Sequence, residues 1–375
     1  MLTIAPFEEQ HAPAVREFNR RLQAGGAPAD YVFSESPVPE WLPPGPGAPV
    51  YNRFYIALED GIVRGAYAVK HQEFLLGGER REIAYYHHPL SEGVIDRKFA
   101  MVGVQMLIQA QRQHPLIYAL GMDGTDQPLP RMLAALKWPS CAIPFFFKVN
   151  HPTSFLRNMR PLRASAARRA LADAAAATGA GWAAFKGVQF LAGLPGAFQR
   201  AEAEEVAEFG EWADEIWRDC VPHFRILAVR DGCTLRTLFP AGNPNFIRLK
   251  VTARGRLLGW AALGDVRKQA HPQYGSLRVG TILDGLARPQ DAAAVVSAAA
   301  RVLEMRGVDV ITSNQSHYAW RRALRRCGFL PGPSNFIFAA SPELSRNMMP
   351  FDETILHSHW TRGDGDNLLQ YVRPV

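Results

Sequence analysis

One stretch of the chain, Arg81–Gln113, decides the fold and reads REIAYYHHPLSEGVIDRKFAMVGVQMLIQAQRQ. It begins with aromatic residues of the kind that favour β-strands, and we predict a strand over Glu82–His88. A turn-like segment follows at Pro89–Gly93, and Asp96 then precedes a helix whose apolar residues recur at helical spacing. A strand, a short loop and a helix N-terminus bring free backbone N–H groups to the positive end of the helix dipole. The stretch therefore predicts a site for a phosphate or pyrophosphate group.

The same order of elements occurs twice along the chain: a hairpin, a strand, a helix, a strand, a helix and a last strand. In the first copy we expect these elements at Tyr51–Leu58 with Ile62–His71, at Glu82–His88, after Asp96, and at Leu116–Leu120, Leu129–Leu136 and Cys141–Val149. In the second copy we expect them at Phe246–Thr252 with Arg256–Leu263, and at Leu277–Asp284, Asp291–Met305, Val308–Ser313, Ser316–Arg326 and Asn335–Ala340. Further helices are expected at Glu8–Leu22, Glu204–Val221 and Ile226–Phe239.

The repeat predicts an α/β protein with mixed sheets, built from two similar domains in tandem. We place the domains at residues 1–150 and 199–345, a partly helical connector at 151–198 and a C-terminal tail at 346–375. Within the first domain, prolines are frequent between Ala27 and Val50 and exclude long regular structure there. A loop of this length inside a domain is usually functional.

Composition and charge restrict the classes of function. The chain has 375 residues, of which 47% are hydrophobic and 21% charged, as in an ordinary globular protein. Its net charge of +7 suits an anionic ligand, but no nucleic-acid-binding motif is present, so we expect no nucleic acid partner. The sequence has no signal peptide, no run long enough to span a membrane and no cysteines at metal-binding spacing. We therefore expect reduced cysteines, no metal and a cytoplasmic location, and the oligomeric state stays open.

Two short motifs and the paired hairpins resemble the GNAT acyltransferase superfamily, in a tandem arrangement. The motifs are Ala-Leu-Arg-Arg-Cys-Gly-Phe at Ala323–Phe329, similar to the Gly-Phe pair that follows a late helix of the family, and Ala-Ala-Leu-Lys-Trp at Ala134–Trp138. The hairpins RFYIALEDGIVRGAYAV and FIRLKVTARGRLLGWAAL look like the second and third strands of the family. The resemblance implies a fold in which two neighbouring strands splay apart and admit the pantetheine arm of an acyl-CoA.

The resemblance also implies where the co-substrate, acetyl-CoA or another acyl-CoA, binds. In the family, a loop with Arg or Gln, two residues, Gly, one residue and then Gly or Ala wraps the pyrophosphate. The corresponding segments here are Arg97-Lys-Phe-Ala100-Met-Val102 and Gln290-Asp-Ala-Ala293-Ala-Val295. Because the first segment begins with two cations, we expect acyl-CoA in the first copy. The expected donor-binding residues are His88, Leu90, Gly93, Arg97, Lys98 and Ala100.

Acyl transfer to an amine requires a base, donors for the developing oxyanion and close approach of the two substrates. Histidine titrates near neutrality, so His87 and His88 are the candidate bases, and Glu82 is a further candidate. One core histidine and one surface histidine is the alternative interpretation, since strand alternation sends them to opposite faces. The general-acid tyrosine frequent in the family is replaced by Leu133 and Leu324. The candidate acceptor-binding residues are Tyr86, Asp284, Asn314, Trp360 and Asp364.

These features predict an acyl-CoA-dependent N-acyltransferase that acts on an amine of a sugar, an amino acid or a related small metabolite. A Fem-like aminoacyl transferase, which also has two GNAT-like units but takes aminoacyl-tRNA, is one alternative, although no long coiled-coil arm is evident. A degenerate, non-catalytic binding or scaffold protein is another. It is favoured by the two off-pattern loops and the two missing tyrosines.

Overall fold

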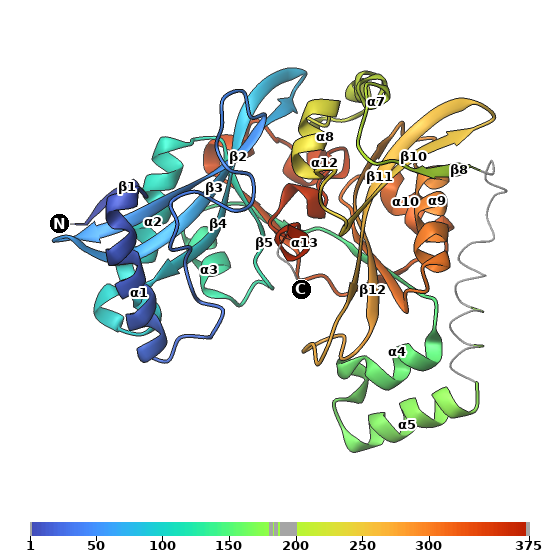
Figure 1. The fold of residues 1–375 in the computed structure, drawn as a ribbon, viewed down its shortest axis with the longest axis horizontal. Helices are drawn as coiled ribbons and strands as arrows, with labels where there is room; N and C mark the ends of the chain where they lie inside the picture. Colours follow the sequence, from blue (N-terminus) through green and yellow to red (C-terminus); the bar gives the residue numbers. More distant parts are fainter. Residues whose placement is uncertain (1, 180–182, 184–186, 188–200, 373–375) are drawn as a thin grey trace. The chain divides into compact units, whose positions relative to one another are not determined.

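The computed structural model of the chain describes residues 2–179, 183, 187 and 201–372 (Figure 1). They form two compact units: unit 1 comprises Met1–Ala142 and Asn335–Thr354, and unit 2 comprises Ile143–Ser334 and Ile355–Val375. The expected α/β class with mixed sheets and a helical connector is confirmed, the connector helices being α4 (Pro152–Asn158) and α5 (Ala166–Ala177). Most of the connector after residue 179 lies outside the described residues.

Unit 1 is a sheet with helices on both faces, in the strand order β1-β2-β3-β4-β5-β15-β6. Its helix α1 (Ala12–Ala24) packs one apolar stripe on one face, while α2 (Ala100–Gln113) and α3 (Pro128–Ala135) cover the other. Each helix buries an apolar stripe because its hydrophobic residues recur every three or four positions. The strands are β1 (Thr3–Pro6), β2 (Val50–Glu59), β3 (Ile62–Leu76), β4 (Glu79–Ser91), β5 (Ile117–Gly121), β6 (Ser140–Ala142) and β15 (Ile337–Ala340).

Unit 2 contains a second sheet, in the order β14-β7-β13-β12-β11-β10-β8. Its strands are β7 (Phe145–Val149), β8 (Glu202–Glu205), β10 (Phe246–Ala253), β11 (Arg256–Arg267), β12 (Arg278–Ala287), β13 (Val310–Asn314) and β14 (Leu330–Gly332). Its other elements include α7 (Trp212–Cys220), β9 (Ile226–Ala228), α8 (Gly232–Leu238), α9 (Ala292–Met305), α10 (Tyr318–Arg326) and α13 (Leu369–Val372). Helices α9 and α10 cover one face, where glycines of β12 pack against Leu303 and Trp320.

The two sheets repeat one another in detail. Each first hairpin closes with a two-residue turn, Asp60-Gly61 or Arg254-Gly255, and both residues of each turn have positive φ, the geometry that twists with the strands. The next antiparallel pair carries a bulge at the same place in both sheets, opposite Ala66–Ala68 in unit 1 and opposite Ala262/Leu263 in unit 2. The predicted repeat is thus present in register as well as in element order.

The last strands of the two copies are exchanged. Strand β15, from the C-terminal half of the chain, lies between β5 and β6, while β7, from the N-terminal half, lies between β13 and β14. The expected strand at Cys141–Val149 is therefore two strands of different sheets, because Pro144 lacks an N–H and interrupts the ladder. The two compact units accordingly differ from the continuous segments 1–150 and 199–345 that the sequence suggested.

Three further expectations about elements were wrong. Strand β4 continues through Pro89 to Ser91, so the expected turn is partly strand and partly a 3₁₀ turn at Glu92–Val94. The expected helix at Glu204–Val221 is a strand, β8, followed by the shorter α7, because Glu202–Glu205 pairs with β10 despite its helix-favouring composition. The segment Ile226–Phe239 contains strand β9, and α8 starts only where Asp231 accepts a hydrogen bond from the Thr234 N–H.

The four cysteines are free thiols. Burial raises the pKa of Cys141, Cys220 and Cys327 to about 12, so these three thiols stay protonated at neutral pH. No helix in the described ranges is both long and apolar enough to cross a bilayer.

Candidate functional site

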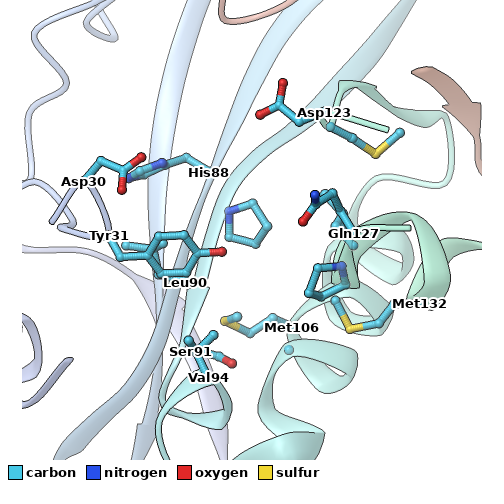
Figure 2. Close-up of a pocket in the computed structure, with 15 residues that line it drawn as sticks. Asp30, Tyr31, His88, Leu90, Ser91, Val94, Met106, Asp123, Gln127 and Met132 are labelled. Atoms are coloured by element: carbon cyan, nitrogen blue, oxygen red, sulfur yellow. The ribbon is translucent and has the colours of Figure 1, made fainter. Parts of the chain in front are cut away.

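The candidate site lies in unit 1, where two parallel strands separate. Strands β4 and β5 are paired only at Ala84 with Ile117 and at Tyr85 with Tyr118, and β4 then continues to Ser91 without β5 beside it. A cavity of about 390 Å³ opens there (Figure 2). Its walls come from the end of β4, from α2 and α3, from the segment after β5 and from the start of the Pro-rich loop. The lining residues are Asp30, Tyr31, His88, Pro89, Leu90, Ser91, Val94, Gly103, Met106, Met122, Asp123, Gln127, Pro128, Leu129 and Met132.

The cavity has an apolar floor and a polar rim. Figure 2 shows Met106 and Met132 on the helix side, and Asp30, Tyr31 and His88 on the side of the loop and β4, with the Tyr31 hydroxyl directed into the space. Methionine side chains adapt to apolar ligands of varied shape, whereas the polar groups fix orientation. The cavity therefore suits a slender apolar chain with a polar end.

His88 sits at the bulge of β4 with φ 50°, a conformation that non-glycine residues rarely adopt. Its ring stacks on Phe33, with the ring centroids 5.9 Å apart, and its Nε2 lies 3.1 Å from the Val32 carbonyl oxygen. Since a carbonyl oxygen only accepts, we assign the proton to Nε2, which leaves Nδ1 as the acceptor of the neutral ring. His88 thus fastens the Pro-rich loop to β4 and faces the cavity.

His87, the neighbouring candidate base, points the other way, as strand alternation predicts. It is 5% exposed, and its Nε2 lies 3.1 Å from Asn52 Oδ1. Burial lowers the pKa of His87 well below its usual range, and the nearby His88 and Lys70 act in the same direction. His87 is therefore a neutral core histidine, and the structure does not bring it to the cavity.

Glu82 and Tyr86 also lie away from the cavity lining. A carboxylate oxygen of Glu82 lies 2.9 Å from Nδ1 of His71 and is hydrogen-bonded to it. This pair is near the end of β4 that is opposite the cavity. Hydrogen bonding to His71 lowers the pKa of Glu82, which keeps this carboxyl ionised. Tyr86 is buried in the core beneath α2, where burial raises the pKa of its hydroxyl well above the usual value.

The residues predicted to hold the donor occupy two places. His88 and Leu90 line the cavity, while Arg97, Lys98 and Ala100 lie at the start of α2, a few residues beyond the lining residue Val94. Asp96 caps this end by accepting from the Lys98 N–H, and it pairs with the Lys98 ammonium at 3.0 Å. Arg97 is exposed, and no partner for it is found within the described part of the chain.

The connection from the cavity to α2 is rigid. The Glu92 carboxylate is buried and bonds to Arg21 and to Arg64, with the Arg64 Nη1 at 2.7 Å. A Cβ at Gly93 would lie 2.8 Å from the Phe99 carbonyl oxygen, so only glycine allows this close approach. Glu92 and Gly93 therefore hold the cavity and the start of α2 in a fixed relation.

In unit 2 the corresponding opening between β12 and β13 is filled by the protein itself. Parallel pairing stops at Ile282 with Ser313, and Asp284 lies just beyond it. Arg230 donates to Asp284 at 2.7 Å and to Asp364 at 2.5 Å, and all three side chains are buried. Burial opposes ionisation of Asp284, but Arg230 and His359 outweigh it and lower its pKa to about 2. A buried ionic triad thus occupies the place that is a cavity in unit 1.

The chain segment that fills this opening comes from the C-terminal tail. The Ser316 N–H donates to the Trp360 carbonyl, Arg362 Nε donates to Asn314 Oδ1 at 2.9 Å, and Thr361 Oγ1 donates to Asp284 at 3.1 Å. The Trp360 side chain is fully buried. Four of the predicted acceptor residues therefore lie together in a buried network of unit 2: Asp284, Asn314, Trp360 and Asp364. None of the four is among the residues that line the cavity of unit 1.

Sequence reasoning missed five polar residues of the cavity, Asp30, Tyr31, Ser91, Asp123 and Gln127. Two signals were available. The Pro-rich loop was expected to be functional, and it supplies Asp30 and Tyr31. Asp123 follows strand β5 in a run from Gly121 to Gly124 in which every residue has positive φ, and such strained segments cluster at functional sites.

No family model matches the sequence, and no curated protein matches it in sequence. Solved structures do match in fold. A GCN5-related N-acetyltransferase from Anabaena variabilis has a TM-score of 0.51 at 9% identity, over 90% of this chain and 72% of that one. A probable N-acyltransferase from Enterococcus faecalis has a TM-score of 0.50 at 9% identity, over 93% and 74%.

A third similar structure is the N-myristoyltransferase of Saccharomyces cerevisiae with bound myristoyl-CoA, with a TM-score of 0.51 at 9% identity, over 90% of this chain and 78% of that one. At this identity the likeness concerns the fold alone. It agrees with the sequence resemblance, with the repeated sheets and with the splayed strands of unit 1. The chain has the fold of the GNAT superfamily.

Proposed function

We propose that unit 1 binds an acyl-CoA at the cavity and transfers its acyl group to an amine. One observation carries this proposal: β4 and β5 part after two paired residues and leave a cavity whose lining leads directly to the N-terminus of α2. A cavity of about 390 Å³ lies near the low end of the size of ligand sites, so it takes a pantetheine arm and a short acyl group rather than a whole CoA.

The donor's charged part is proposed to lie outside the cavity, at the start of α2. The positive end of the helix dipole favours an anion at this position. Arg97 and Lys98 add two exposed cations beside it. The pantetheine arm would then pass Val94 and Ser91 toward His88, along Met106 and Leu90.

His88 is the proposed base and Tyr31 the proposed acid. The nitrogen of a neutral amine attacks the thioester carbonyl carbon, and the carbon–sulfur bond breaks. The nitrogen gives one proton to Nδ1 of His88, and the departing sulfur takes one from the Tyr31 hydroxyl, so that an amide and free CoA result. Tyr31 would supply the function that Leu133 and Leu324 cannot, since neither leucine carries a proton donor.

The acceptor is proposed to be a small cationic amine. Two carboxylates, Asp30 beside His88 and Asp123 on the opposite side, lie at the cavity and would attract an ammonium group into it. Once the ammonium has lost one proton to solvent water, the neutral amine lies within reach of the thioester, and its second proton is the one that His88 takes during the attack. The two carboxylates would also repel anionic acceptors. Phosphosugars without an amine are therefore excluded as acceptor substrates.

A thermal-shift titration with CoA, acetyl-CoA and a longer acyl-CoA tests the proposal, because a ligand of the folded state raises the melting temperature. The decisive variant is Gly103→Met, since Gly103 lines the cavity in mid-helix and a larger side chain fills the space toward Met132. Gln105→Met is the matched control, because it places the same side chain on an exposed position of the same helix.

We expect acetyl-CoA to stabilise the wild type and the Gln105→Met variant but not the Gly103→Met variant. Turnover of acetyl-CoA with small diamines, followed as thiol release, should show the same pattern. Absence of any shift for all three CoA compounds in the wild type would overturn the proposal and leave a non-catalytic protein as the better interpretation.

A further inference from the structure

Three potential metal ligands meet in unit 1, outside the cavity. They are His71 on β3, Glu82 on β4 and His114, which directly follows α2. In the register of the sheet His71 lies opposite Ala84, so Glu82, two residues earlier, projects from the same face. One ligand atom from each residue lies within 4.8 Å of the others. The three are 11 and 32 positions apart in sequence, so no spacing motif announces them.

The two imidazoles have nitrogens that the fold leaves unsatisfied. Nε2 of His71 and Nε2 of His114 are buried and have no hydrogen-bond partner among the residues that the structure describes, although the rings are in contact at a centroid distance of 4.9 Å. The His71 side chain is only 4% exposed. A buried polar atom that nothing satisfies destabilises the folded state. The unsatisfied Nε2 of His114, in a cluster with the His71 ring and the Glu82 carboxylate, calls for an occupant.

We propose that His71, Glu82 and His114 bind one divalent transition-metal ion of the zinc type. Two imidazole nitrogens and one carboxylate oxygen form a donor set that suits Zn²⁺ and excludes Mg²⁺ and Ca²⁺, which take oxygen ligands. The ion would bind His71 through Nδ1 and displace the proton now held between this atom and Glu82. Ligands of a tetrahedral zinc lie about 3.4 Å apart. Nδ1 of His71 and the carboxylate oxygen of Glu82 are already closer than this. A rotation of the His114 side chain would bring its ligand nitrogen to the same distance.

The surroundings fit an ion that enters from solvent. The Glu82 side chain is 51% exposed, so the site is open on one side. Tyr51, opposite His71 on β2, stacks on the His71 ring at 4.6 Å and fixes its plane. Arg53 lies over the ring of Tyr51, with its guanidinium carbon 5.4 Å from the ring centroid.

The site would stabilise the fold and not take part in acyl transfer. Glu82 and His88 are six residues apart on one strand, which is about 20 Å. A bound ion would join β3, β4 and the end of α2, and two of these elements, β4 and α2, also line the cavity. The inference therefore stands whether or not the protein is an acyltransferase.

The test is calorimetric titration of the chelator-treated full-length chain with Zn²⁺, with Mg²⁺ as the second titrant, and melting temperatures in parallel. We expect one Zn²⁺ per chain, a higher melting temperature with Zn²⁺ and no binding of Mg²⁺. His114→Ala should abolish this binding, and Glu82→Gln should weaken it by about 100-fold. His151→Ala is the matched control, because His151 is an exposed histidine that also has a carboxylate partner, Asp309, at 3.2 Å.

Glu82→Gln keeps the test decisive even if a histidine variant is poorly folded, because Glu82 is half-exposed and the change is isosteric. The proposal would be wrong if the His114→Ala and Glu82→Gln variants bound Zn²⁺ as the wild type does, or if the wild type bound no stoichiometric Zn²⁺. Either result would show that the cluster is only a hydrogen-bonded group with water on its free nitrogens.

Discussion

The openings between parallel strands in the two units are built alike and used differently. In unit 1 the space beyond Tyr85 and Tyr118 is a cavity, whereas in unit 2 the space beyond Ile282 and Ser313 holds a buried arginine, two carboxylates and a segment of the tail. A repeated fold therefore offers the same site twice, and the side chains decide whether it binds a ligand or becomes part of the core.

The helices that follow these strands differ in the same sense. The start of α2 has Arg97 and Lys98, and Arg97 is free to meet an anion. At the start of α9, Asp291 holds Arg256 in an ion pair at 2.8 Å, and Arg288 pairs with Asp219 at 2.5 Å. A carboxylate stands at the start of both helices, Asp96 at α2 and Asp291 at α9, so the two helix ends differ in their cations rather than in their acidic residues. The cations near α9 are already paired with carboxylates, and this makes unit 2 less suited to a pyrophosphate.

The largest expected effect is at the proposed base of the open site. His88→Gln should lower kcat by about 100- to 10,000-fold, the range for loss of a general base, because glutamine keeps a polar side chain but cannot take up the proton. The assay is thiol release from acetyl-CoA with an amine acceptor, alongside a CoA thermal shift to show that the donor still binds. His151→Gln, on unit 2, is the control. Wild-type turnover in the His88→Gln variant would remove this residue from the mechanism.

The next effect concerns the filled opening. Asp284→Ala leaves Arg230 buried with one carboxylate instead of two and should reduce the free energy of unfolding of unit 2 by about 3 kcal/mol, as for other broken buried ion pairs. Urea unfolding of the full chain measures this. The stabilisation by CoA should persist, since the donor site lies in unit 1. Loss of CoA binding with unchanged stability would reverse the roles assigned to the two openings.

A pH effect distinguishes unit 2 in a third way. Burial lowers the pKa of His317 to about 3, and His359, His357 and His223 add to this. The unfolded chain binds a proton here below about pH 6.5 and the folded chain does not, so stability falls as the pH drops from 6.5 toward 3. Between pH 7 and 5 this histidine should account for about 2 kcal/mol.

The variant that tests this is His317→Asn. His317 caps α10 by accepting from the Ala319 N–H at 3.3 Å, and asparagine can cap without titrating. Unfolding free energies at pH 7 and pH 5 should therefore differ less in the variant than in the wild type. An equal difference in both proteins would mean that other groups cause the acid sensitivity.

Many of the helices and strands compared here could be predicted from the sequence, but not all of them. The two hairpins, the parallel strand pairs and the helices after them follow from local periodicity and from the Asp-Gly and Arg-Gly turns, so they could be placed from the sequence. The exchange of β7 and β15 could not, because it depends on which sheet edge each strand meets after Pro144 and not on the strand's own residues. Strand β8 was missed for the same reason, as pairing with β10 overrides its helix-favouring composition.

The site was predictable in part. His88 and Leu90 were identified because they end the strand that precedes the helix, and the structure places both at the cavity. The first copy was preferred as the donor site because of Arg97 and Lys98. The structure adds a second reason, the filled opening of unit 2, which no local sequence pattern predicts. Arg230, Asp284 and Asp364 are 54 and 80 positions apart, and only the fold brings them together.

The smallest expected effect tests the two helix N-termini directly. Arg97→Glu places a carboxylate where the pyrophosphate is proposed to bind, and Arg288→Glu makes the same change before α9. Because an exposed charge near a helix end interacts only modestly with an anion, we expect the first variant to bind CoA about 3- to 10-fold more weakly. The second should bind CoA as the wild type does, since Arg288 already faces Asp219 and the opening between β12 and β13 is filled by the buried Arg230 and its two carboxylates. The difference should shrink at high salt, because ions screen surface charges. Equal weakening by both variants would mean that net charge, and not the start of α2, attracts the donor.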